Sequence, residues 1–79
     1  MRTYLVRLRE NKGLSMRRLA REAGISFQYY STIEDGEKGN KMSLIITGKI
    51  AKALDISLEV FYELEKEYQE SLLSKYGNS

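Results

Sequence analysis

The sequence predicts an all-α fold of five helices, of which the last is long. Apolar residues recur at steps of three and four, which is the spacing of one face of a helix. No stretch alternates between apolar and polar residues as a half-buried β-strand does, and the 79 residues contain no proline. Serine precedes most of the helical stretches and glycine follows most of them, at the places where helices begin and end.

The first helix is expected over residues 3–11. Leu5 and Leu8 have the spacing of an inward face, and Gly13 stands where the left-handed residue after a helix usually lies. The charged residues around this helix are expected to lie in water: Arg2, Arg7 and Lys12.

The second and third helices are expected over residues 16–23 and 27–35, with Gly24 in the turn between them. Ser15 and Ser26 precede these helices, and each can accept a hydrogen bond from a free amide of the first turn. The apolar residues on one side of each helix predict the faces that meet in the core: Leu19, Ala20, Ala23, Tyr30 and Ile33.

The fourth helix is expected over residues 44–54, with Ser43 as its cap and Asp55 as its end. Ser57 caps a fifth helix that continues to about residue 75. Its length is indicated by a stripe of large side chains at steps of three and four: Phe61, Leu64, Tyr68, Leu72 and Tyr76.

Length and composition are typical of one soluble globular domain, with 42% apolar and 30% charged residues. No apolar run approaches the roughly 20 residues that span a bilayer, and the first residues lack the apolar core of a signal peptide. The chain has no cysteine, so neither a disulfide framework nor a thiolate metal site is expected. We therefore expect a cytoplasmic protein with no membrane partner.

The net charge is only +2, but the positive charge is concentrated in the first half of the chain. Residues 1–41 carry a net charge of +4, and residues 42–79 carry a net charge of −2. A polyanionic partner would therefore be drawn toward the first half.

Residues 15–36 combine two short helices with a glycine-containing turn, which is the pattern of a helix-turn-helix. Residues 5–62 resemble the Cro/repressor-type (Xre-like, lambda-repressor-like) helix-turn-helix domains in four segments: LRENKGLS (8–15), LAREAGIS (19–26), YSTIEDG (30–36) and KIAKALDISLEVFY (49–62). The resemblance implies a compact five-helix domain that binds double-stranded operator DNA, usually as a two-fold dimer. We expect residues 1–62 to form the DNA-binding domain and residues 63–79 to form a helical extension that is a candidate dimerisation element.

The second helix of such a motif enters the major groove of DNA. The candidates for base contact are the side chains expected on its outer face: Phe27, Gln28, Tyr29 and Thr32. Glutamine can bond N6 and N7 of adenine, threonine can offer a hydroxyl or a methyl group, and an aromatic edge can pack on a thymine methyl. Burial in the core or at a protein interface is the alternative for Phe27 and Tyr29.

Candidate phosphate contacts flank this helix. The free amides at the start of the helix over residues 16–23 attract phosphate, and polar or cationic side chains accompany them there and in the loop after residue 36. These residues are Ser15, Arg17, Arg18, Lys38, Asn40 and Lys41. A basic face that is simply solvated is the alternative for the arginines and lysines.

Arg9 and Glu34 are expected to be structural. The resemblance implies this role, because their positions match an arginine and a glutamate that pair in related domains. Such a pair would set the angle between the first and third helices without touching DNA.

Two interpretations of the C-terminal stripe are open: it packs on its own domain, or it pairs with a second copy. A chain of 79 residues has little surface to cover so many large side chains, which favours a homodimer. The residues expected at its interface are Ile45, Phe61, Leu64, Tyr68 and Leu72. A two-fold dimer would read a palindromic site, with its recognition helices about 34 Å apart.

Catalysis is not expected, because histidine and cysteine are both absent. The segment GEKGNKMS (36–43) lacks the spacing of a phosphate-binding loop. We therefore expect no catalytic residue, metal, cofactor or small-molecule ligand, and no room for a separate sensing domain. The sequence predicts a DNA-binding transcriptional regulator, by default a repressor. The alternative is a protein-interaction module of the same fold, antitoxin-like or anti-repressor.

Overall fold

The computed structural model describes residues 1–36 and 42–76, with side chains as far as Leu73. Within these ranges the chain forms α1 (Thr3–Asn11), α2 (Met16–Ala23), α3 (Phe27–Asp35), α4 (Leu44–Leu54) and α5 (Leu58–Tyr76), with no strand. The predicted all-α fold is confirmed, and the predicted helix limits agree with the observed ones to about one residue.

Helix starts follow from local chemistry. The hydroxyls of Ser15, Ser26, Ser43 and Ser57 each accept a hydrogen bond of 3.1 Å from the backbone N–H three residues later. Each such cap typically stabilises a helix by about 1 kcal/mol. Helix ends are equally local, because Gly24 and Gly36 adopt left-handed conformations with φ of 73° and 70°.

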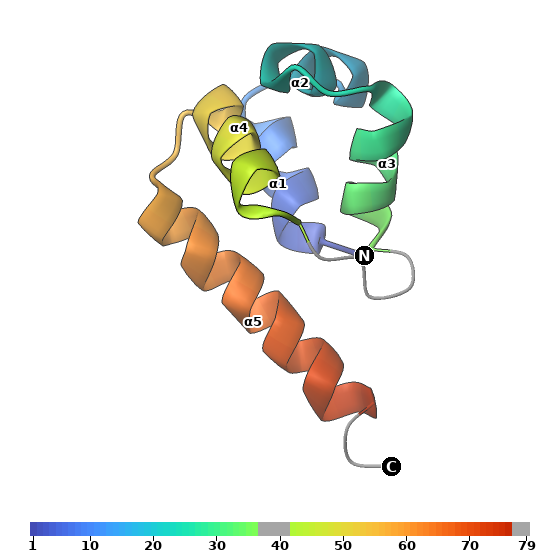
Figure 1. The fold of residues 1–79 in the computed structure, drawn as a ribbon, viewed down its shortest axis with the longest axis vertical. Helices are drawn as coiled ribbons and strands as arrows, with labels where there is room; N and C mark the ends of the chain where they lie inside the picture. The colour runs from blue at the N-terminus through green and yellow to red at the C-terminus, as the bar shows by residue number, and fades with distance from the viewer. Residues whose placement is uncertain (37–41, 77–79) are drawn as a thin grey trace.

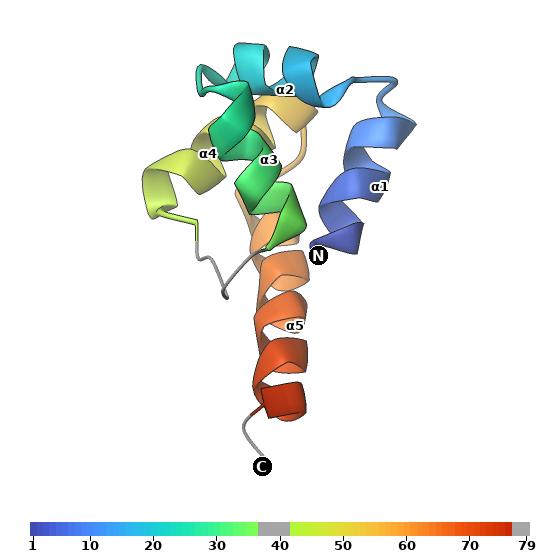
Figure 2. The same cartoon turned by 90° about the vertical axis from the view of Figure 1, so that its right-hand side faces the viewer.

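The helices are arranged so that α2 packs on both α3 and α4, α1 packs on α3, and α4 packs on α5 (Figure 1). The first four helices form the body of the molecule. The C-terminal half of α5 extends beyond that body in both views (Figures 1 and 2).

One core joins all five helices. Its members are Leu5, Leu19, Ala20, Ala23, Tyr30, Ile33, Ile50, Ala51, Leu54 and Phe61, none of which is more than 5% exposed. The inward faces predicted for the second and third helices are thus confirmed, and Leu8 packs half-buried against the same core. Because α3 buries Tyr30 and Ile33, its opposite side is turned to solvent.

The expectation that Arg2 lies in water is wrong, because its side chain is fully buried. Its guanidinium makes two 2.9 Å hydrogen bonds to the carboxylate of Glu65 on α5 and a third, of 2.6 Å, to the carbonyl of Ile33. Its backbone N–H donates to the carbonyl of Glu34 at 2.8 Å. A charged group tolerates burial only with such partners.

Two members of the C-terminal stripe, Phe61 and Tyr68, pack on their own chain. Phe61 lies in the core with no exposed surface, so its assignment to a dimer interface is wrong. Tyr4 joins Phe61 and Tyr68, with ring centroids 5.9 and 6.4 Å away respectively, and the Arg2 guanidinium lies 4.8 Å from the centre of the Tyr68 ring. Tyr68 therefore anchors α5 near the start of α1, where Tyr4 and Arg2 offer an aromatic and cationic surface.

The other residues expected at a dimer interface differ in exposure. Leu64 is half-buried and lines a shallow depression together with Tyr4 and Tyr68. Leu72 is half-buried, whereas Ile45 is 67% exposed. The side chain of Tyr76 lies outside the described residues, and the predicted division after residue 62 falls inside α5.

Candidate nucleic-acid interface

The turn between α2 and α3 sets the angle of the candidate recognition helix. Gly24 takes the left-handed conformation that other residues adopt at a cost. The N–H of Ile25 then donates to the carbonyl of Ala20 at 3.0 Å, which closes the end of α2. Ile25 packs on the core, so the chain turns sharply and α3 starts at Phe27.

The outer side of α3 presents polar side chains to solvent. Gln28, Thr32 and Asp35 are all exposed, and their spacing places them in one row opposite Tyr30 and Ile33. Tyr29 flanks this row and is 37% exposed, while Phe27 is half-buried at the start of the helix. The base-contact candidates therefore lie on the open side of the helix or at its edge.

The two polar candidates differ in how much hydrogen-bonding capacity they retain. The Thr32 hydroxyl donates to the carbonyl of Tyr29 at 2.7 Å, which leaves its lone pairs and its methyl group for a base. Among the described residues, the Gln28 amide has no hydrogen-bond partner. Gln28 can therefore offer a donor and an acceptor together, as recognition of adenine requires.

Arg17 and Phe27 join the starts of α2 and α3. The guanidinium carbon of Arg17 lies 4.1 Å from the centre of the Phe27 ring, well within the range of a cation–π contact. Such a contact stabilises an exposed site by about 0.5–1 kcal/mol. The sequence did not predict this contact, because it depends on how the two helices cross.

The remaining phosphate-contact candidates are partly engaged within the fold. Arg18 forms a 2.9 Å ion pair with Glu22 one turn later on α2. The Ser15 hydroxyl accepts from the N–H of Arg18, which leaves its own hydrogen to donate. Lys38, Asn40 and Lys41 lie outside the described residues.

Arg9 holds Glu34 by two hydrogen bonds of 2.9 and 3.1 Å and also donates to the carbonyl of Leu14 at 2.9 Å. Tyr30 adds a 2.6 Å hydrogen bond to the same carboxylate. The hydrogen bond to Glu34 raises the pKa of Arg9 further, and burial together with that carboxylate raises the pKa of Tyr30. The contacts tie α1, the turn before α2 and α3 together behind the exposed face.

A second polar cluster, around Glu65, was missed by sequence reasoning. Tyr4 donates its hydroxyl to Glu65, and the Gln69 amide donates to it at 2.8 Å. Burial acts most strongly on the pKa of Glu65 and raises it, but the hydrogen bonds from Arg2, Gln69 and Tyr4 and the Arg2 charge together hold that pKa below its usual range. No local sequence pattern predicts this cluster, because Arg2 and Glu65 are 63 residues apart.

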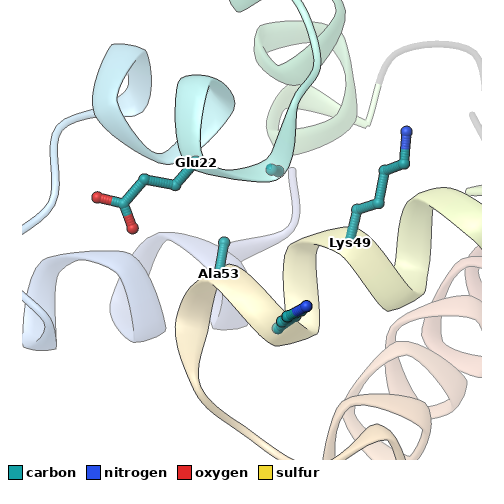
Figure 3. A pocket seen from close by; sticks show the side chains of 5 residues that line it. Glu22, Lys49 and Ala53 are labelled. Carbon is teal, nitrogen blue, oxygen red and sulfur yellow. The ribbon is translucent and has the colours of Figure 1, made fainter.

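Beyond these two clusters, the described residues line an open groove. An open groove of about 510 Å³ runs between α2 and α4, and Figure 3 shows Glu22 and Lys49 at its opposite ends with Ala53 between them. Within the described ranges no group of three or more acidic side chains is placed to hold a metal ion. No described helix is both long and apolar enough to cross a membrane.

Comparison with known proteins agrees with this geometry. The family described as Helix-turn-helix matches residues 5–61. The uncharacterized HTH-type transcriptional regulator Rv0474 of Mycobacterium tuberculosis is 44% identical over 54 residues, which make up 68% of this chain and 37% of that protein. The uncharacterized HTH-type transcriptional regulator YqaF of Bacillus subtilis is 35% identical over 63 residues, 80% of each chain.

The match covers most of α1, all of α2 to α4 and the start of α5, whereas Arg2 and Glu65 lie outside it. This chain spans 37% of the length of the Mycobacterium tuberculosis relative. The resemblance seen in the four sequence segments is confirmed: the chain belongs to the Xre-like, lambda-repressor-like helix-turn-helix family.

Proposed function

We propose that this chain is a sequence-specific DNA-binding transcriptional regulator that places α3 in the major groove. The observation that carries this proposal is the row of exposed polar side chains on α3, opposite the buried Tyr30 and Ile33. Gln28 bonds an adenine edge, and Thr32 contacts a base through its methyl group or lone pairs. The names of the two relatives, both HTH-type transcriptional regulators, support the same function.

Phosphate contacts position the domain and supply most of the salt-dependent affinity. Ser15 donates its hydroxyl hydrogen at the start of α2, where the helix dipole also favours an anion. Arg18 exchanges its exposed partner Glu22 for a phosphate, because a surface ion pair of this kind stabilises by well under 1 kcal/mol. Lys38, Asn40 and Lys41 continue the phosphate contacts beyond α3.

A homodimer that binds a palindromic operator and represses transcription is the second part of the proposal. Its support is the set of large apolar side chains that remain at least half exposed on α4 and α5: Leu44, Ile45, Leu58, Val60, Tyr62 and Leu73. Two-fold pairing of this surface would present two copies of α3 to successive major grooves. Bound across a promoter, such a dimer would exclude polymerase.

Selection of bound sequences from a random duplex pool tests the DNA-binding proposal. We expect one enriched sequence, and an affinity that falls steeply as salt increases. Gln28→Ala should relax the preference at an adenine, and Arg18→Ala should reduce the salt slope by about one. Lys66→Ala is the matched control, since it removes an exposed charge from α5 without touching the interface.

Absence of an enriched sequence together with a flat salt response would contradict DNA binding and favour a protein partner.

Sedimentation equilibrium tests the dimer separately. We expect Ile45→Glu to weaken self-association and Arg7→Glu, an exposed change on α1, to leave it unaltered. An enriched site without two-fold symmetry would contradict the palindromic operator.

A further inference from the structure

We infer that Arg17 reads a guanine base, not a phosphate, and that the Phe27 ring aims it there. The inference rests on the proposed DNA-binding function and deepens it. Arg17 belongs to the first turn of α2 and Phe27 is the first residue of α3. The contact between them places a planar cation beside the start of the recognition helix.

The position of Phe27 determines where Arg17 is held. In a helix-turn-helix docked on DNA, the N-terminal residues of the recognition helix lie nearest the base edges. Arg17 rests 4.1 Å from the centre of the Phe27 ring, so its guanidinium is carried to that end of α3. Among the described residues no carboxylate pairs with Arg17, so its hydrogen-bond donors remain available.

The chemistry of the guanidinium favours guanine at this place. Its fork of N–H donors matches O6 and N7 of guanine, which are two acceptors side by side in the major groove. The stacked ring reduces the rotamer freedom that an arginine must otherwise lose on binding. Arg18 and Arg21 provide further exposed cations on the same helix, so phosphate contacts there do not require Arg17.

The part of the Phe27 ring that Arg17 leaves uncovered can contact an apolar group on a base. Phe27 is only half-buried, although one face is covered by Arg17. A thymine methyl is the apolar group that the major groove offers. The pair therefore acts as one unit that reads a guanine next to a thymine.

The test starts from the sequence that the wild-type chain selects. In that duplex, guanine is replaced by 7-deazaguanine, which lacks the N7 acceptor, and thymine by uracil, which lacks the methyl group. We expect 7-deazaguanine to weaken wild-type binding roughly 10-fold, within the range of a bidentate base contact. The same replacement in the DNA should not change the affinity of the Arg17→Ala variant. Arg17→Lys should keep the salt slope but weaken the guanine preference, because lysine has the charge without the planar fork that stacks on the Phe27 ring.

Phe27→Leu separates the aiming role from apolar contact. Replacing thymine by uracil should still weaken binding of this variant in part, whereas replacing guanine by 7-deazaguanine should weaken it little. Far-ultraviolet circular dichroism controls for folding, and Arg17 is an exposed position. An enriched site that tolerates 7-deazaguanine, with Arg17→Ala lowering only the salt slope, would overturn the guanine assignment and leave DNA binding intact. Failure to enrich any sequence would overturn both.

Discussion

Replacing Glu65 by glutamine is expected to destabilise the folded chain by about 3 kcal/mol. The substitution keeps the shape of the side chain and removes its charge. Arg2 then remains fully buried but loses the carboxylate of Glu65, and its guanidinium faces an amide nitrogen that also donates. The expected loss of stability comes mainly from two donors facing each other in a buried site, and less from the lost attraction between the charges.

The magnitude follows from the contacts. Removing one partner of a buried pair costs about 3–5 kcal/mol. The Glu65 side chain is 17% exposed, and Arg2 keeps its hydrogen bond to the Ile33 carbonyl, so the lower end of this range applies. A domain of this length has a stability of roughly 4–12 kcal/mol in total. The variant is therefore expected to stay folded at 25 °C with roughly 1–9 kcal/mol of stability left.

Urea unfolding followed by circular dichroism measures the effect. With a slope of about 1 kcal/mol per molar urea for so small a domain, the midpoint should fall by about 3 M. Glu63→Gln, an exposed change on the same helix, should shift the stability by no more than about 0.5 kcal/mol. The double variant Arg2→Met with Glu65→Leu should recover much of the loss. A loss below about 1 kcal/mol for Glu65→Gln would refute the reasoning.

The remaining predictions concern acid stability, two glycines and Arg9. The pKa of Glu65 in the folded chain lies below its unfolded value of about 4.3. The difference in stability between wild type and Glu65→Gln should therefore be constant above pH 5 and should become smaller as the pH falls below about 4. A difference that grows in acid would contradict this. Gly48→Ala should raise the free energy of unfolding by about 1 kcal/mol and so raise the urea midpoint, since a Cβ there meets no atom within 4 Å. Gly36→Ala should destabilise the chain more than Gly24→Ala does. Both glycines adopt a positive φ, but only at Gly36 would the added Cβ overlap a side chain, at the Tyr68 hydroxyl. Equal losses of stability would contradict that packing. Arg9→Met should lower stability by about 3 kcal/mol in urea while the salt slope of DNA binding stays unchanged, and a changed slope would place Arg9 on DNA.

The sequence by itself determined the limits of the helices. A serine cap needs only the amide three residues later, as at Ser26, and a left-handed glycine needs only its own backbone, as at Gly24. Periodicity likewise identified the buried face of α3 through Tyr30 and Ile33. These signals are local, so they can be read without knowing how the helices pack.

The tertiary structure alone decided the packing of α5 and the polar cluster around Glu65. The stripe that includes Phe61 has the same spacing whether its own core or a second copy covers it, and only the packed fold assigned Phe61 to the core. Arg2 looked like a solvated residue until Glu65, far along the chain, was brought to it. The Arg17–Phe27 stack likewise exists only at one helix crossing. Contacts between distant residues depend on the global arrangement of the chain, and no short stretch of sequence encodes them.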